Sequence, residues 1–104
     1  MEEWEEIEEG RKDDTGKPDW HCVPMEIIAL LVPVFEHGVE KYGRFNCLKP
    51  FPDYDQRFYS AKMRHTVASQ LDPLAIDKES GLYHEAQVAF NALLRLHNAL
   101  RESK

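Results

Sequence analysis

Three segments of the chain carry apolar residues at intervals of three or four positions, the spacing of one face of an α-helix. No segment keeps the strict alternation of apolar and polar residues that is typical of a half-buried strand. The pattern predicts a small all-α domain with three main helices, near residues 24–42, 55–71 and 81–101.

Proline and glycine define the first of these helices. Pro24 is well placed as a first helical residue, and Gly43 favours a left-handed helix end. Pro33 lies inside the segment and removes one backbone donor. We therefore expect a kink or a local break near Ala29–Pro33.

The third helix has two distinct faces and a polar start. Asp77 and Ser80 offer side-chain oxygens that can cap it. Its apolar face consists of Leu82, Ala86, Ala89, Leu93, Leu96 and Leu100. The opposite face carries His84, Asn91, Arg95 and Asn98, with Gln87 beside them. We expect the leucines to face the core, and the polar face to be either solvated or part of a site.

The predicted helices belong to a single domain of 104 residues. Residues 1–20 form an acidic N-terminal arm and a Gly-Lys-Pro loop, and residues 21–104 form the helical core. Leu30, Phe90 and Leu94 lie outside the expected core stripes and need cover. Because a chain of this length buries little surface alone, we expect a homo-oligomer, most simply a dimer, to supply that cover.

The charge of the chain restricts its binding partners, and its apolar runs bear on its compartment. A formal charge of −6 and a pI near 5.3 argue against binding to duplex nucleic acid or to an anionic membrane. No apolar run is long enough to span a bilayer and no signal-peptide pattern occurs, so we expect a cytoplasmic protein. Cys22 and Cys47 are isolated, and we expect both to be reduced thiols.

The polar residues favour a small phosphorylated ligand. The chain has no Walker-type phosphate loop, no Gly-x-Ser-x-Gly elbow and no His-Glu-x-x-His motif. Its histidines, carboxylates, lysines and arginines are spread over helix ends and two loops. Carboxylates and imidazoles can hold a divalent ion and its water, while lysines and arginines neutralise phosphate oxygens.

We assign these residues to roles in one cleft. His65 shares the apolar stripe of the second helix, where a histidine is more often a core residue than a ligand, but Arg64 lies next to it. The candidate catalytic and metal-binding residues are His65, Asp77 and His84, assisted as metal ligands by Glu36 and Glu40 unless these two are simply exposed. The candidate phosphate-binding residues are Lys17, Lys41 and Arg64. For the sugar or base we consider Asn46 and Asn91, with Tyr42 available for stacking.

Short motifs in the same order suggest a family. They are Thr15-Gly16-Lys17-Pro18 followed by Val23-Pro24, Gly38-Val39-Glu40-Lys41-Tyr42-Gly43 with Asn46, Arg64-His65, and Asp77-x-Glu-Ser-Gly-Leu-x-His84 with Asn91. With these motifs the chain resembles the phage-associated dATP/dGTP diphosphohydrolase N-terminal domain. The resemblance implies hydrolysis of dATP and dGTP to the monophosphate, in the host cytoplasm if a phage encodes the protein. It also implies functional similarity to the all-α MazG-like pyrophosphohydrolases, which act with Mg²⁺.

The chain departs from that family at two positions. Gln87 stands where a second histidine is frequent, and Cys47 stands where a tryptophan commonly follows the asparagine. The Glu-x-x-Asp part of the MazG-type signature is also missing. Two hypotheses follow: an enzyme that converts purine deoxynucleoside triphosphates to monophosphate and pyrophosphate with Mg²⁺ or Mn²⁺, and a non-catalytic binder that sequesters a nucleotide or a nucleotide-derived signal.

Overall fold

The computed structural model describes residues 8–104, and the structure of this region is helical. Its α-helices are α2 (Met25–Ile28), α3 (Val32–Tyr42), α4 (Tyr54–Ser69) and α5 (His84–Glu102). Three 3₁₀ turns accompany them: η1 (Trp20–Cys22), η2 (Ala29–Leu31) and η3 (Asn46–Leu48). Within the described range the extended pairing is one isolated bridge, Ile76 with Tyr83. The all-α prediction is confirmed, while the start of the acidic arm, residues 1–7, lies outside the described residues.

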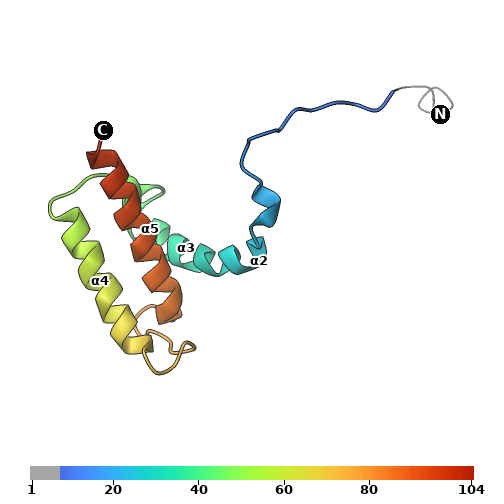
Figure 1. The fold of residues 1–104 in the computed structure, drawn as a ribbon. Helices are drawn as coiled ribbons and strands as arrows, with labels where there is room; N and C mark the ends of the chain where they lie inside the picture. The colour runs from blue at the N-terminus through green and yellow to red at the C-terminus, as the bar shows by residue number, and fades with distance from the viewer. Residues whose placement is uncertain (1–7) are drawn as a thin grey trace.

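The two longest helices form an antiparallel hairpin, and α3 lies against α5 (Figure 1). The segment before η1 runs away from the helices, so the chain is elongated (Figure 1). Its radius of gyration is 19.9 Å and its longest dimension is 61 Å. A compact domain of this length has a radius of gyration of about 13 Å. The chain therefore leaves much of its surface open.

The first predicted helix is interrupted just before Pro33. Helix α2 passes into the 3₁₀ turn Ala29–Leu31, and α3 then begins with Pro33 in its first turn. Because the first backbone N–H groups of a helix have no partner within that helix, proline costs little at this position. The predicted break near Ala29–Pro33 is confirmed.

The core of the chain is small and largely aromatic. Val34, Tyr54 and Leu94 are the buried hydrophobic residues of the described range. The ring centroids of Phe35 and Phe90 lie 4.8 Å apart in an edge-to-face contact, which joins α3 to α5. Further ring contacts link Phe51, Tyr54, Phe58 and Phe90 across the hairpin. Edge-to-face and tilted arrangements of this kind are the favourable ones for aromatic pairs.

Helix α5 packs through the face opposite to the expected one. Leu93, Leu96 and Leu100 are 47%, 57% and 57% exposed, whereas Asn91 and Asn98 are 5% and 3% exposed. The expectation that the leucines face the core is therefore wrong. The expectation that Phe90 and Leu94 need cover from another chain is also wrong, because Leu94 is buried within the chain and Phe90 packs on aromatic rings.

Buried asparagines are tolerated on this face because their amides have partners. Asn91 donates from Nδ2 to the carbonyl oxygen of Gln87 at 2.7 Å, and Asn98 accepts a hydrogen bond from Arg101 through Oδ1. A buried amide that keeps its hydrogen bonds avoids most of the penalty of losing water. The periodicity of α5 defines its two faces, and these contacts decide which of them is inside.

The apolar stripe of α2 and α3 also faces outward. Ile28, Val39 and Tyr42 are exposed, Phe35 stays 38% exposed although one edge of it contacts Phe90, and the buried residue of α3 is Val34. Leu30 is likewise exposed. No helix of residues 8–104 combines the length and the apolar character needed to cross a membrane.

The third helix starts three residues later than predicted, at His84. Gly81 has a φ of 76°, a left-handed conformation that glycine adopts without strain. Tyr83 occupies the N-cap position and makes no capping hydrogen bond through its side chain. Asp77 and Ser80 therefore do not cap α5. Both residues lie in the loop that precedes it, and there they contribute to the candidate site.

Candidate metal site

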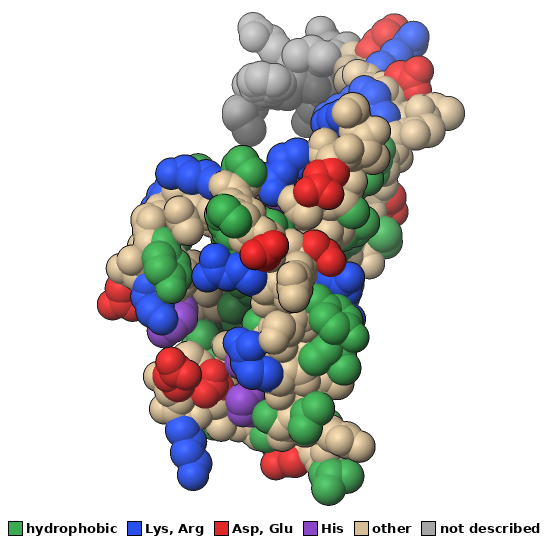
Figure 2. All heavy atoms as spheres, turned by 90° about the vertical axis from the view of Figure 1, so that its left-hand side faces the viewer, with side chains coloured by type: hydrophobic (Ala, Val, Ile, Leu, Met, Phe, Trp, Pro, Cys, Tyr) green, Lys and Arg blue, Asp and Glu red, His purple; other side chains and the backbone are tan. Residues whose placement is uncertain are grey.

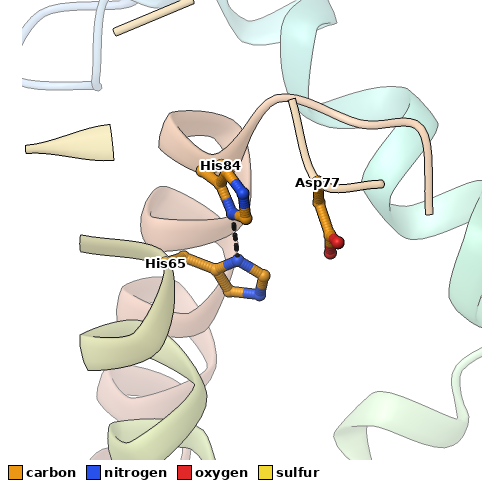
Figure 3. Close-up of side chains that lie close together, drawn as sticks. All are labelled: His65, Asp77 and His84. Carbon is orange, nitrogen blue, oxygen red and sulfur yellow. Dashed lines mark hydrogen bonds between the residues drawn. The ribbon is translucent and has the colours of Figure 1, made fainter. Parts of the chain in front are cut away.

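Three potential metal ligands meet where the hairpin turns. His65 comes from α4, Asp77 from the loop between α4 and α5, and His84 from the first position of α5 (Figure 3). One donor atom from each residue lies within 4.8 Å of the other two. Among residues 8–104 no other group of three or more histidine, cysteine or acidic side chains comes together in this way. The structure thus brings together the three residues to which the sequence analysis assigned catalysis.

The loop is folded back so that Asp77 lies beside the start of α5. The backbone N–H of Asp77 donates to the carbonyl oxygen of Leu82 at 2.8 Å, and that of His84 donates to Ala75 at 3.0 Å. These bonds flank the isolated bridge and close the loop on itself. Since backbone bonds hold both ends of the loop, its acidic residue has a defined position next to the two histidines.

The two imidazole rings are in direct contact. Their Nδ1 atoms are 2.8 Å apart, and the ring centroids of His65 and His84 are 5.1 Å apart (Figure 3). Two imidazole nitrogens at this distance share one proton, so one nitrogen donates and the other accepts. A cation held by both Nδ1 atoms would take the place of that proton.

The surroundings of His65 favour its neutral form. Burial lowers the pKa of His65, and the nearby His84 lowers it further. Asp77 acts in the opposite direction, and Arg64 adds to the lowering. Because a neutral imidazole is the form that binds a metal ion, this environment suits a ligand at neutral pH.

Asp77 is held as a carboxylate by its neighbours. Oδ1 accepts from the backbone N–H of Glu79 at 3.0 Å, and Oδ2 accepts from Ser80 Oγ at 3.2 Å and Gln87 Nε2 at 3.4 Å. Burial raises the pKa of Asp77, but these hydrogen bonds and His84 outweigh it, and the net pKa is lowered. The carboxylate is therefore charged and fixed in orientation.

Gln87 has a structural role that the sequence analysis missed. It lies one turn after His84 and donates to both Asp77 and Ser80, the latter at 3.3 Å. In the sequence analysis, Gln87 was noted as the residue that stands where a second histidine is frequent in the family. The spacing from His84 to Gln87, three residues on one helix, was the signal that both side chains face the same loop.

Arg64 directly precedes His65 on α4. Its side chain is exposed and donates from Nη1 to Ser60 Oγ at 3.1 Å, one turn earlier on α4. Its charge is close enough to affect His65. Arg64 is therefore a candidate partner for a phosphate group placed beside the histidines. Figure 2 shows basic side chains near histidines on this face of the molecule.

Several predicted site residues lie elsewhere. Glu36 and Glu40 are exposed on α3 and do not belong to the three-residue cluster. Lys41 lies over the ring of the neighbouring Tyr42, 5.7 Å from its centroid. Lys17 belongs to the segment that runs away from the helices (Figure 1). In this chain, none of these five residues contributes a donor atom to the cluster.

The two predicted asparagines are not members of the cluster. Asn46 begins η3, which packs on the C-terminal end of α5, where Arg101 donates to the carbonyl of Leu48. His84 and Arg101 are seventeen residues apart on one helix, or about 25 Å. Asn91 is buried, and its Nδ2 is already engaged with the backbone. The structure therefore shows no direct hydrogen bond between either asparagine and the three ligands within residues 8–104.

The ligand types and their spacing fit a divalent cation. Two imidazole nitrogens and one carboxylate oxygen are common ligands of first-row transition metals. Donor atoms about 2.1 Å from one ion are at most about 4.2 Å apart, so the observed spread closes with a small movement of the side chains. Three ligands from the protein also leave positions open for other groups.

The hairpin and its His-Asp-His cluster define a small all-α domain with a candidate divalent-metal site. The chain belongs to the family described as dATP/dGTP diphosphohydrolase, N-terminal, which it matches over residues 7–104. The resemblance drawn from the sequence motifs is thereby confirmed. No curated protein and no solved structure matches the chain.

Proposed function

We propose that this chain binds a divalent transition-metal ion through His65, Asp77 and His84 and hydrolyses purine deoxynucleoside triphosphates at that site. The observation that carries the proposal is the convergence of the three donor atoms within 4.8 Å. Membership of the dATP/dGTP diphosphohydrolase family supports the substrate class and the products, a monophosphate and pyrophosphate. The family is described as the N-terminal part of the diphosphohydrolase. Hydrolysis by this chain alone is therefore the activity to measure.

The ligand set favours Mn²⁺ over Mg²⁺. Magnesium prefers oxygen ligands in strict octahedral geometry and gives up its waters reluctantly. Two of the three donors at this site are imidazole nitrogens, which Mg²⁺ binds poorly, which Mn²⁺ accepts more readily, and which later transition metals such as Fe²⁺ and Zn²⁺ prefer. When bound, such an ion neutralises charge on phosphate oxygens and lowers the pKa of a coordinated water.

The side chains at the site have separate roles in holding the metal ion and the substrate. Asp77 supplies the negative charge of the site, and Gln87 and Ser80 fix its orientation. His65 is kept neutral by burial and by His84, so it is ready to bind without first losing a proton to solvent. Arg64 is exposed and can pair with the triphosphate group of the substrate.

Turnover by the purified chain tests the proposal. Incubation with each deoxynucleoside triphosphate and Mn²⁺ should yield monophosphate and pyrophosphate from dATP and dGTP. His84→Ala should lower the rate by about 10²-fold or more, the usual size of an acid–base or metal-orienting contribution. His97→Ala is the matched control, because His97 lies on the same helix and contacts the carbonyl of Leu48 at the opposite end. Equal rates for both variants would refute the site.

A second candidate function is nucleotide binding without hydrolysis. Within residues 8–104, the cluster contains one carboxylate, that of Asp77. Both of its oxygens already accept hydrogen bonds from neighbouring groups. No second carboxylate joins it to act as a general base. Saturable thermal stabilisation by dATP or dGTP, with no product formed, would select this alternative.

A further inference from the structure

The outward face of α5 is apolar along almost its whole length. We define the leucine face as Ala86, Ala89, Leu93, Leu96 and Leu100. The neighbouring outward positions are Ala92 and Ala99, and the charged residues of α5 lie on its other sides or at its ends. In a chain with 31% charged residues, a solvent-facing helix surface without charge is unusual. Such a surface marks an interaction site.

The spacing of the leucine face is that of a coiled-coil seam. Its residues follow one another at intervals of three, four, three and four. This places them at the a and d positions of successive heptads, the narrow stripe through which one helix packs on another helix. The three leucines are each about half exposed, so within this chain the seam has no partner helix.

The rest of the chain buries little apolar surface for its length. Within residues 8–104, Val34, Tyr54 and Leu94 form the buried hydrophobic core, and no side chain of that range is less than 2% exposed. The radius of gyration, 19.9 Å, exceeds the roughly 13 Å of a compact chain of this length. Small chains of this kind gain stability by burying apolar faces against another body.

We propose that the leucine face binds the leucine face of a second copy of this chain, with the two α5 helices antiparallel. This register places Leu93 opposite Leu96 of the second copy and Ala89 opposite Leu100 of the second copy. The centre of the seam then pairs leucine with leucine, and toward each end an alanine faces a leucine, so each of these layers contains at least one leucine. The same pairs recur on both sides of a two-fold axis, as in an isologous interface.

A second copy fits this face better than other occupants do. Each chain carries a formal charge of −6, so self-association requires a contact surface that is free of acidic residues. The leucine face meets this requirement. Binding to an anionic membrane would instead require flanking basic residues, which the neighbouring alanines do not provide.

The adjacent helix extends the contact area. A stable dimer buries about 800 Å² on each partner, more than one narrow helix stripe supplies. Phe35 of α3 contacts Phe90 of α5, and Phe90 lies one turn before Leu94, next to the leucine face. Phe35 and Val39 are both more than a third exposed. The apolar stripe of α3 can thus continue the interface beyond α5.

The mass of the protein in solution tests the proposal, which is independent of the proposed hydrolysis. Sedimentation equilibrium should give twice the chain mass of 12.1 kDa at tens of micromolar. Leu96→Lys should give a monomer and keep the helical circular-dichroism spectrum. Leu71→Lys is the matched control, because Leu71 is 95% exposed and lies outside the leucine face. A monomeric wild type, or a Leu96→Lys dimer, would overturn the proposal.

Cross-linking tests the orientation without a disruptive substitution. In a background with Cys22→Ser and Cys47→Ser, we consider two chains, one with Ala89→Cys and one with Leu100→Cys. Under mild oxidation the equal mixture should form a mixed disulfide dimer, and neither chain alone should form one efficiently, since antiparallel pairing separates identical positions. Efficient cross-linking of the Ala89→Cys chain with itself would refute the antiparallel arrangement. This cross-linking experiment would decide the question even if the Leu96→Lys variant failed to fold.

Discussion

Two adjacent leucines of α5 should respond very differently to the same substitution. Leu94 is 2% exposed, whereas Leu93 is 47% exposed. Replacing either with alanine removes the same atoms and changes the helix propensity equally. The difference between the two variants therefore reports which face of α5 is inside.

The expected magnitudes follow from burial. Removing three carbons from a buried position costs about 2.4 kcal/mol in transfer free energy, and the cavity left behind adds to this. For Leu94→Ala we expect a loss of about 3 kcal/mol in the free energy of unfolding. For Leu93→Ala, where solvent fills the space, we expect about 1 kcal/mol or less.

Urea unfolding followed by circular dichroism measures both values. It should be carried out over a series of protein concentrations, because Leu93 lies on the leucine face and its loss also weakens the proposed dimer. At concentrations where the chain is monomeric, the difference between the variants should be about 2 kcal/mol. Equal losses, or a larger loss for Leu93→Ala at these concentrations, would refute the observed orientation of α5.

Three other substitutions probe separate parts of the molecule. Gln87→Leu should weaken Mn²⁺ binding by about 10- to 100-fold while the chain stays folded, because Asp77 loses one orienting partner; unchanged affinity in a calorimetric titration would exclude that role. Burial raises the pKa of Tyr54, so the folded state keeps its phenol proton longer than the unfolded state and stability should fall as the pH rises above about 10. Tyr54→Phe should remove that part of the decline in alkaline unfolding curves, and an identical pH profile would contradict it. Arg101→Ala should destabilise the chain by about 1–3 kcal/mol through its lost hydrogen bonds without changing Mn²⁺ affinity, measured by unfolding and titration in parallel.

The sequence predicted the helices well because their signals are local. Pro33 disrupts the first helix through its own missing donor, and the structure has its break at the residues just before it. The apolar spacing likewise identified α5 almost to its last turn. Its start was predicted too early, because Asp77 and Ser80 serve a loop and do not serve as caps.

The packing of α5 could not be read from its pattern alone. One face carries leucines and the other carries Asn91, Leu94 and Asn98, and hydrophobicity favours the leucines for the interior. The structure reverses this choice because the asparagines keep their hydrogen bonds when buried and because Phe90 meets the aromatic rings of α3 and α4. These contacts are tertiary, and no window of the sequence contains them.

The candidate site was predictable in part for the same reason. His65 and His84 are nineteen residues apart in the chain. The fourteen-residue connection between α4 and α5, residues 70–83, returns the chain so that the last turns of α4 lie beside the start of α5. Asp77 lies in that connection, so its approach to the histidines follows from the hairpin. The assignments of Lys41 and Asn46 depended on how α3 and η3 pack, and the structure places η3 at the far end of α5.

Direct titration with Mn²⁺ tests the metal site, which is the central claim. Chelator-treated wild-type protein should bind one Mn²⁺ per chain. Asp77→Asn should weaken binding by at least about 100-fold, more than the loss of an outer hydrogen-bond partner costs. Asp72→Asn is the matched control, because both aspartates accept a backbone N–H from two residues later and only Asp77 joins the histidines. The account predicts normal binding by Asp72→Asn and lost binding by Asp77→Asn, and equal affinities in the two variants would contradict it.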